Sequence, residues 1–430
     1  MRIAEHMLRK QTAVTAQLRF GIQTAAGVIQ IDVSAGIEAG IFNGTQVIDN
    51  VRGWICRVSL EKCYKFGVGS GHLSLRFNLT TDMPLNTNAY NNCMPKICIM
   101  PRVDGLAGVA SFRLKFEDGL RARGVDVTHD LSAPSDAILV LAGTRHLLPL
   151  WRARSRGQRI VQRLDGINWV HKKRNTGLKH YLRAEYGNFI LSFIRSRIAT
   201  RIVYQSEFSR DWWEAWYDRT RVPSAVIHNG VDLNAYSTGQ DSIPPYPPYK
   251  FLIVEGSLGG GYDMGLDNAV RLSEILHEKH NLPIELVVVG KITDEHRQRV
   301  ESKTNILINW MGSVPRERIP EIDRSAHLLF SADLNAACPN SVIEALACGL
   351  PVLAFDTGAL KELVPGDSGR VVPYGGDPWK IDPPDVPALA EAAVEILRDQ
   401  PRFRRSAREG AEKNLGLDVM VEKYLAVLLG

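Results

Sequence analysis

The chain has 430 residues, of which 45% are hydrophobic and 23% charged, and its formal net charge is +5. These values exclude a disordered or fibrous chain and indicate a globular protein long enough for about three domains. No apolar run approaches the ~20 residues of a transmembrane helix, and residues 1–20 carry charges where a signal peptide has its apolar core. We therefore expect a cytoplasmic protein whose six cysteines, which lack zinc-binding spacing, stay reduced.

Residues 1–93 differ in pattern from the rest of the chain. They contain a glycine-rich stretch at 67–71, an asparagine-rich stretch at 86–92 and only weak alternation of apolar and polar residues elsewhere. A buried-strand pattern starts at Met94, so we expect 1–93 to be an N-terminal extension of unknown role. Two origins are open: an upstream stretch that the native protein lacks, or a genuine small β-rich appendage.

From residue 94 onward, short apolar runs alternate with longer amphipathic ones. This rhythm predicts a parallel sheet with crossover helices in a first domain that spans 94–240. The expected strands are 97–100, 137–141, 159–163, 201–204 and 224–228, and the expected helices are 109–123, 147–156, 178–199 and 207–216.

A proline-rich linker at 236–249 interrupts this rhythm, and a second series follows in 241–400. Its expected strands are 251–254, 284–289, 306–310, 327–330, 351–354 and 370–372, and helices at 386–398 and 401–430 close the chain. The pattern predicts an α/β protein with two doubly wound, Rossmann-like parallel-sheet domains that face a cleft.

The most informative segment is 338–353, CPNSVIEALACGLPVL, which indicates a loop, a short helix, a glycine stop and a buried strand. The N–H groups at the helix start, with roughly +0.5 charge of helix dipole, can hold a phosphate oxygen. They belong to Asn340, Ser341 and Val342. Glu344 lies one turn further in, where its carboxylate can accept two hydroxyl hydrogen bonds from a ribose. The alternative is an ordinary α/β helix whose Glu344 is solvated.

Together with Asn229-Gly230-Val231-Asp232 and with 352–358, this segment resembles the donor-site signature of family 4 glycosyltransferases. Members of that family are retaining enzymes with the GT-B fold, in which two Rossmann-like domains face each other. The resemblance covers about 94–430 and implies that Glu344 binds the ribose of a nucleotide-sugar donor. It also implies that helices at 401–430 cross back to the first domain. The first glutamate of the family's Glu-x7-Glu motif is missing, because Ala336 stands in its place.

A glycine-rich loop follows the first strand of the second domain, where open α/β sheets bind ligands. Its glycines let backbone N–H groups approach a diphosphate, and the alternative is a flexible loop without a ligand. The family's usual basic pair appears here as Ser257 and Met264. We expect Ser257 to lie in the donor site and Lys291 to supply a cation, although a solvated lysine is the alternative. The loop glycines expected at the donor are Gly259, Gly260 and Gly261.

Two stretches of the first domain are candidates for the acceptor side of the cleft. Gly105 and Gly108 lie in a loop after its first strand, where they permit close approach to the donor. Arg163, Asp165 and His171 follow a later strand. Asp165 or His171 can orient the acceptor hydroxyl or accept its proton, whereas Asp165 can also simply pair with Arg163. We expect Gly230 to take a positive φ in a turn.

The segment 145–201 is strongly basic, with Asp165 and Glu185 as its only acids. Solvated helix faces, peripheral contact with the acidic inner face of a membrane and binding of an anionic acceptor all fit this charge. We expect no nucleic-acid partner, because no recognition motif accompanies the charge. The chain has no Asp-x-Asp motif, so we expect a metal-independent enzyme without a cofactor.

The resemblance implies a glycosyltransferase that moves a sugar from a nucleotide-sugar to an acceptor hydroxyl with retention of configuration. Cell-surface polysaccharide, glycolipid or glycoconjugate synthesis is its expected setting, with a sugar, a lipid-linked molecule or a small molecule as acceptor. Two alternatives remain open: a nucleotide-sugar epimerase on the same fold, and a non-catalytic GT-B protein that binds nucleotide-sugar. The departures at Ala336, Ser257 and Met264 favour the second of these.

Overall fold

The computed structural model describes residues 94–103, 108–239, 244–258 and 263–430, together with the backbone of five strands between residues 22 and 75. The chain divides into two compact units, Met1–Cys93 and Met94–Gly430. In the first unit, β1 (Ile22–Ala25), β2 (Val28–Asp32) and β5 (Ser74–Leu75) form one antiparallel sheet. A second antiparallel pair joins β3 (Gln46–Val51) to β4 (Trp54–Val58). The origin of residues 1–93 stays a prediction.

The second unit contains two six-stranded parallel sheets, of which the first has the strand order β11-β10-β9-β8-β6-β7. Its strands are β6 (Lys96–Met100), β7 (Asp126–Thr128), β8 (Ala137–Leu141), β9 (Arg159–Leu164), β10 (Arg201–Tyr204) and β11 (Ser224–Val226). All five residues of β8 are buried, as a strand covered on both faces requires. The expected parallel sheet is therefore confirmed, with β7 as an additional edge strand.

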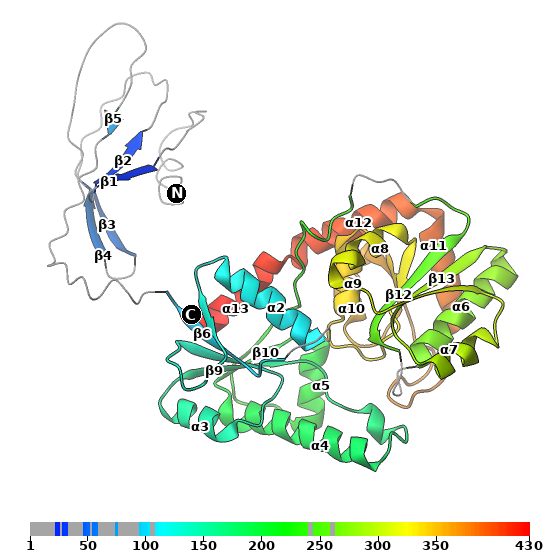
Figure 1. Ribbon diagram of the computed structural model, residues 1–430, viewed down its shortest axis with the longest axis horizontal. Helices are drawn as coiled ribbons and strands as arrows, with labels where there is room; N and C mark the ends of the chain where they lie inside the picture. Colours follow the sequence, from blue (N-terminus) through cyan, green and yellow to red (C-terminus); the bar gives the residue numbers. More distant parts are fainter. Residues whose placement is uncertain are drawn as a thin grey trace, which may run out of the picture. The chain divides into compact units, whose positions relative to one another are not determined.

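Helices cover both faces of this N-terminal sheet (Figure 1). On one face, α2 (Gly108–Arg121) packs beside the last helix of the chain. On the other lie α3 (Leu147–Ser155) and α4 (Leu178–Phe193), which continues as a π-helical turn at Ile194–Ile198. α5 (Glu207–Tyr217) is capped by Ser206, whose side-chain oxygen accepts a hydrogen bond from the Ser209 N–H. No helix in the described part of the chain is both long and apolar enough to span a membrane.

The C-terminal sheet has the order β14-β13-β12-β15-β16-β17, again with every pair parallel. Its strands are β12 (Tyr249–Ser257), β13 (Ile284–Lys291), β14 (Leu307–Gly312), β15 (Leu328–Phe330), β16 (Val352–Phe355) and β17 (Gly369–Val372). One core forms where α8 (Ile319–Ser325) and α9 (Asn340–Ala347) pack on the sheet. The other contains α6 (Met264–His280) and α11 (Val386–Arg398). Shorter helices are α7 (Asp294–Glu301) and α10 (Leu360–Leu363).

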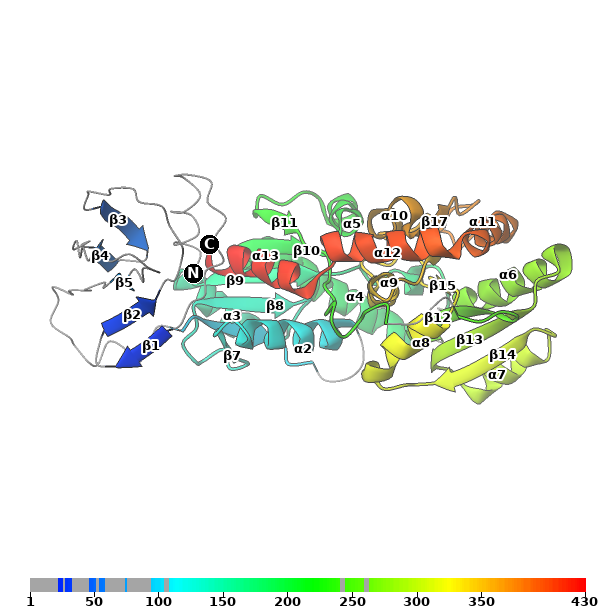
Figure 2. The same ribbon diagram turned by 90° about the horizontal axis from the view of Figure 1, so that it is seen from above.

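The C-terminal end of the chain returns to the N-terminal domain. α12 (Gln400–Asn414) packs on α9, and α13 (Leu417–Leu429) lies along the N-terminal sheet beside α2 (Figure 2). The Tyr424 ring centroid lies 5.3 Å from that of Phe112 and 5.1 Å from that of Phe116. The two sheet domains therefore share a helix-packed connection at one end.

The Asn-Gly-Val-Asp segment lies where this crossing takes place. Val231 exchanges two backbone hydrogen bonds with the turn before α13, to the Leu415 carbonyl at 2.9 Å and from the Leu417 N–H at 2.8 Å. A Cβ on Gly230 would lie 2.9 Å from the Leu417 Cα. The prediction of a positive φ at Gly230 is wrong, because Gly230 is not one of the described glycines that have a positive φ. Close backbone approach is what requires glycine there.

His327 attaches the end of the proline-rich linker to the C-terminal sheet. Its Nδ1 accepts a 2.9 Å hydrogen bond from the Lys250 N–H, and its Nε2 lies 3.2 Å from the Pro244 carbonyl oxygen, to which it donates. The side chain is fully buried. Burial lowers the pKa of His327 to about 4, and the charges of Arg404 and Lys250 act in the same direction.

This burial predicts a loss of stability in mild acid. The folded protein resists protonation of His327, whereas an unfolded histidine titrates near ~6.5, so the stabilisation present above that value is lost as the pH falls toward 4. Between pH 7 and pH 5, wild type should lose about 2 kcal/mol more unfolding free energy than His327→Gln. Urea unfolding of both proteins at the two pH values measures this difference. Equal losses would contradict the assigned role of His327.

Candidate functional site

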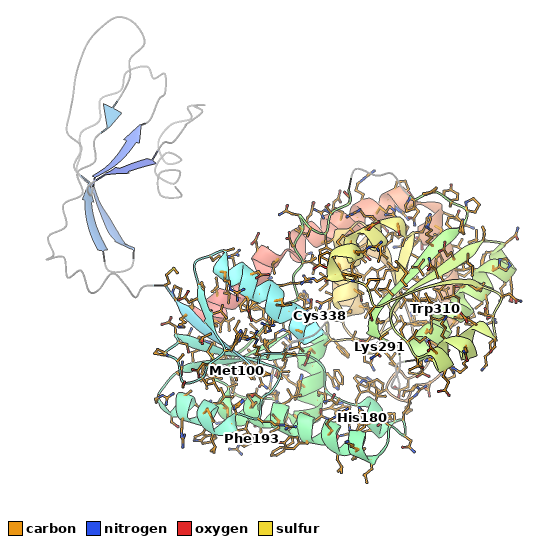
Figure 3. The ribbon with its side chains drawn as sticks, viewed as in Figure 1. Met100, His180, Phe193, Lys291, Trp310 and Cys338 are labelled. Atoms are coloured by element: carbon orange, nitrogen blue, oxygen red, sulfur yellow. The ribbon has the colours of Figure 1, made fainter. Side chains whose placement is uncertain are left out.

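A cleft of about 1540 Å³ opens between the two parallel sheets and takes its lining from both domains. The N-terminal domain contributes Arg163 from the end of β9 and Asp165 directly after it. The C-terminal domain contributes Glu255 from β12 and Glu344 from α9. In Figure 3, the labels His180 and Cys338 mark residues that line opposite sides of this cleft. The carboxyl ends of parallel strands are where open α/β sheets bind ligands.

The N-terminus of α9 opens on the cleft. The helix starts at Asn340 after Pro339, which makes no side-chain cap, so its first N–H groups stay available for an anion. Asn340 and Ser341 line the cleft, whereas the Val342 side chain is buried in the core and only its backbone can serve a ligand. The structure thus places the three residues where the sequence predicted, and their contact with a phosphate stays a prediction.

Glu344 lines the cleft and is held by a cation from the opposite domain. Lys115 of α2 donates from Nζ to Glu344 Oε1 at 2.7 Å, and the two side chains are only 4% and 9% exposed. Burial lowers the pKa of the Lys115 ammonium, and the Glu344 carboxylate opposes this shift. The ribose contact stays a prediction, but a solvated Glu344 is excluded in this structure. Lys115 was not predicted from the sequence. The available signal was a cation three residues after Phe112 on the buried side of α2, where Arg113 is buried as well.

Arg163 and Asn229 connect the floor of the cleft to the loop before α9. Arg163 Nη2 donates to Asn229 Oδ1 at 2.9 Å, and its guanidinium lies 3.9 Å from the Phe112 ring centroid. Asn229 Nδ2 in turn donates to the Cys338 carbonyl at 3.0 Å and to Asn340 Oδ1 at 3.1 Å. Asn229 therefore positions the start of α9 from the N-terminal domain.

Asp165 and His171, the two predicted catalytic residues, lie in different surroundings. Asp165 lines the cleft, and burial raises the pKa of its carboxyl group while the Arg163 charge opposes this. His171 is buried, and its Nε2 lies 2.6 Å from Glu185 Oε1. It is not among the described residues that line the cleft. The geometry therefore favours Asp165 over His171 for contact with an acceptor.

The remaining predicted residues have mixed positions. Gly108 and Ser257 line the cleft, and a Cβ on Gly108 would lie 3.8 Å from Asn340 Nδ2. Lys291 is exposed and lies outside the cleft lining of the described chain, although its neighbour Gly290 belongs to it. Gly105 and the glycines Gly259, Gly260 and Gly261 lie outside the described residues.

Further polar contacts join the two domains around the cleft. Arg174 Nη1 lies 2.7 Å from Asp263 Oδ1. Glu362 of α10 accepts hydrogen bonds from the backbone N–H groups of Glu207 and Phe208, at 2.8 and 2.7 Å, and so caps α5. Arg316, which also lines the cleft, was missed by the sequence analysis. Its charge contributes to the lowered pKa of Lys115, so it lies near the Glu344 corner.

A family of known proteins resembles the C-terminal domain, which forms one side of the cleft. Residues 252–399 match the family model described as glycosyl transferases group 1. The chain resembles group 1 glycosyltransferases over this segment. The match contains most of β12 and all of α9 and α11, and it includes every C-terminal cleft residue named above.

Two curated relatives match parts of the chain. A lipopolysaccharide core biosynthesis mannosyltransferase of Rhizobium meliloti (strain 1021) is 25% identical over 228 residues, which are 48% of this chain and 60% of that protein. A D-inositol 3-phosphate glycosyltransferase of Thermomonospora curvata is 28% identical over 146 residues, which are 33% of this chain and 32% of that protein. The chain thus matches less than two thirds of the length of either relative.

Solved glycosyltransferase structures share the architecture of the second unit. Sucrose-phosphate synthase from Thermosynechococcus elongatus superposes with a TM-score of 0.58 at 15% identity, over 78% of this chain and 98% of that one. WaaG, a glycosyltransferase involved in lipopolysaccharide biosynthesis, superposes with a TM-score of 0.56 at 14% identity, over 78% of this chain and 100% of that one. Anabaena HepE in complex with UDP-glucose superposes with a TM-score of 0.53 at 14% identity, over 77% of this chain and 98% of that one. At these identities the similarity concerns the fold, and the expected GT-B fold is confirmed.

Proposed function

We propose that this protein transfers a sugar from a nucleotide-sugar to an acceptor hydroxyl, with retention of anomeric configuration. The observation that carries the proposal is Glu344, one turn into a helix whose free N-terminus opens on a cleft between two Rossmann-like domains. The group 1 match over 252–399 and the UDP-glucose complex of Anabaena HepE support a nucleotide-sugar as donor. One relative is named for lipopolysaccharide core biosynthesis, which supports polysaccharide, glycolipid or glycoconjugate synthesis as the setting.

In the proposed reaction, the nucleoside diphosphate leaves on the face from which the acceptor attacks. The N–H groups of 340–342 stabilise the charge that grows on the leaving phosphate, and Glu344 holds the ribose. Ser257 and Met264 supply no cation in place of the family's basic pair. We propose that Arg316, which lines the cleft, offsets the diphosphate charge without a metal or cofactor, while contributions from the glycine loop and from Lys291 stay predictions. Asp165 orients the acceptor hydroxyl.

Turnover assays with UDP-glucose, UDP-GlcNAc and GDP-mannose test this proposal. We expect release of the nucleoside diphosphate from at least one α-linked donor, and NMR of the freshly formed product should show the α anomer. A β product would contradict retention. An epimerised donor without transfer would favour the epimerase, and nucleotide binding without any turnover would favour the non-catalytic protein.

We further propose that the N-terminal domain docks on an anionic membrane, which would place a lipid-linked acceptor at the cleft. The outer faces of α3 and α4 form what we call the α3–α4 face, whose apolar side chains are exposed by 41–74%. Exposed cations lie around these apolar side chains. Glu185 is the acidic residue of α3 and α4, and its carboxylate is already paired with His171 and Lys172. The same helix α4 lines the cleft with His180 and Arg183. The apolar side chains of the α3–α4 face are Leu148, Trp151, Leu178, Tyr181, Leu182, Tyr186 and Phe189.

Vesicle flotation tests this contact. Apolar side chains next to cations bind the interface of anionic bilayers, and each cation contributes roughly 1 kcal/mol. The double variant Arg152→Gln/Lys179→Gln should therefore bind phosphatidylglycerol-containing vesicles about tenfold or more weakly than wild type. The matched control Lys279→Gln/Lys303→Gln removes two exposed cations of the C-terminal domain and should bind like wild type. Equal binding of all three proteins would contradict docking through this face.

A further inference from the structure

The cleft segment before α9 has Ala336 at the position where the family 4 resemblance implies the first glutamate of the Glu-x7-Glu motif. Ala336 is 5% exposed and lines the cleft, so no side-chain polar group reaches the ligand space from this position. The backbone there is tightly fixed, because a Cβ on Gly358 would lie only 2.5 Å from the Ala336 nitrogen. Any replacement for the missing acid must therefore come from neighbouring residues.

Two carboxyl groups line the same part of the cleft as Ala336. Glu255 lies near the end of β12, and Asp333 follows β15, which pairs directly with β12 through Phe251 and Leu328. Among the described residues, neither carboxyl group forms an ion pair with a basic side chain. Two carboxyl groups in one site do not both ionise readily. Burial raises the pKa of Asp333 to about 6, and burial together with the charge of Asp333 raises the pKa of Glu255 well above its ordinary value. A carboxyl group in such a pair can keep its proton beside an ionised neighbour, so the two groups together can both donate and accept hydrogen bonds.

An unpartnered amide lies in the same loop. Asn335 is 4% exposed and lines the cleft, yet its Nδ2 has no hydrogen-bond partner in the described structure. Its backbone takes the left-handed conformation, with φ of 59°. Buried polar groups are almost always paired, and leaving one unpaired costs free energy. A ligand that brings an acceptor to this loop would satisfy the amide.

These three groups fit a ring of hydroxyl groups better than an anion. Hydroxyls both donate and accept, which matches two carboxyl groups and an amide N–H, whereas negative charge on this carboxyl pair disfavours a phosphate. The loop 333–336 directly precedes the α9 start proposed to hold the diphosphate, with Glu344 further along the helix. We propose that Asp333, Asn335 and Glu255 form the donor-sugar subsite and replace the acid absent at Ala336. This inference rests on the proposed function.

Calorimetric titration with UDP, UDP-glucose, UDP-GlcNAc, GDP and GDP-mannose separates the sugar contact from the nucleotide contact. We expect at least one nucleotide-sugar to bind more tightly than its own nucleotide. Asp333→Asn, Glu255→Gln and Asn335→Gly, which tolerates the positive φ, should each reduce this advantage about tenfold or abolish it. Each variant should keep the nucleotide affinity of wild type, which also verifies that it is folded. Glu391→Gln, an exposed acid on α11, is the control and should change neither affinity.

Each other outcome counts against the inference in a distinct way. A sugar advantage that survives all three substitutions overturns the subsite, as does a panel in which no nucleotide-sugar exceeds its nucleotide. An advantage that appears only with added magnesium and disappears with EDTA overturns it in favour of a metal held by the carboxyl pair. If no nucleotide binds at all, the proposed function itself fails, and the subsite fails with it.

Discussion

Replacing Glu344 with glutamine is expected to weaken nucleotide binding by about 10–100-fold. A hydrogen bond to a charged acceptor contributes roughly 1.5–3 kcal/mol, and the amide removes the charge that the ribose hydroxyls would meet. Lys115 holds Glu344 Oε1, so the carboxylate is already oriented before a ligand arrives. The measurement is a calorimetric titration of wild type and variant with the nucleoside diphosphate that binds best.

The matched control for this variant is Glu321→Gln. Glu321 is an exposed carboxylate on α8, the helix that packs beside α9. Its Oε2 lies 3.6 Å from Nε of Arg318, which is also exposed. This control should leave nucleotide affinity unchanged. If Glu344→Gln binds nucleotide as tightly as the control does, Glu344 is not a ribose ligand.

The second large effect is expected at Lys115, where a substitution by methionine leaves Glu344 buried without its cation. Breaking a buried ion pair from one side costs roughly 3–5 kcal/mol, because the remaining charge is uncompensated. Urea unfolding of Lys115→Met should therefore show a loss of that size. Lys115→Met/Glu344→Gln should recover much of the loss, because no charge then stays unpaired.

Lys361→Met is the comparison on the protein surface. Lys361 pairs with Asp356 but is well exposed, and such pairs contribute roughly 0–1 kcal/mol. A loss at Lys115→Met no larger than this, or losses that simply add in the double variant, would contradict a tight ion pair between the domains.

The two sheets were predictable because their strands are covered on both faces. β8 and β16 appear in the sequence as unbroken apolar runs, which local pattern alone reveals. The edge strand β7 was not predictable from this signal, since Asp-Val-Thr is short and none of its residues is fully buried. The π-helical turn at the end of α4 also leaves no periodic signal that differs from a continuous helix.

The candidate site was predictable only where it is local. The start of α9 and Glu344 lie within one segment, whereas Lys115 approaches Glu344 across 229 positions of the chain. The proximity of Glu255 and Asp333 depends on the adjacency of β12 and β15, which spacing cannot reveal. Spacing likewise gave no reason to prefer Asp165 over His171, because the contact of His171 with Glu185 requires the folded α4.

The most direct test of a nucleotide-sugar site in this cleft is the equilibrium binding of UDP and GDP to the wild-type protein, measured by calorimetry. We expect that at least one of them binds with one site per chain, and that a nucleotide concentration one hundred times its dissociation constant stabilises the fold by about 2.7 kcal/mol. Absence of binding by both nucleotides at millimolar concentration would contradict it.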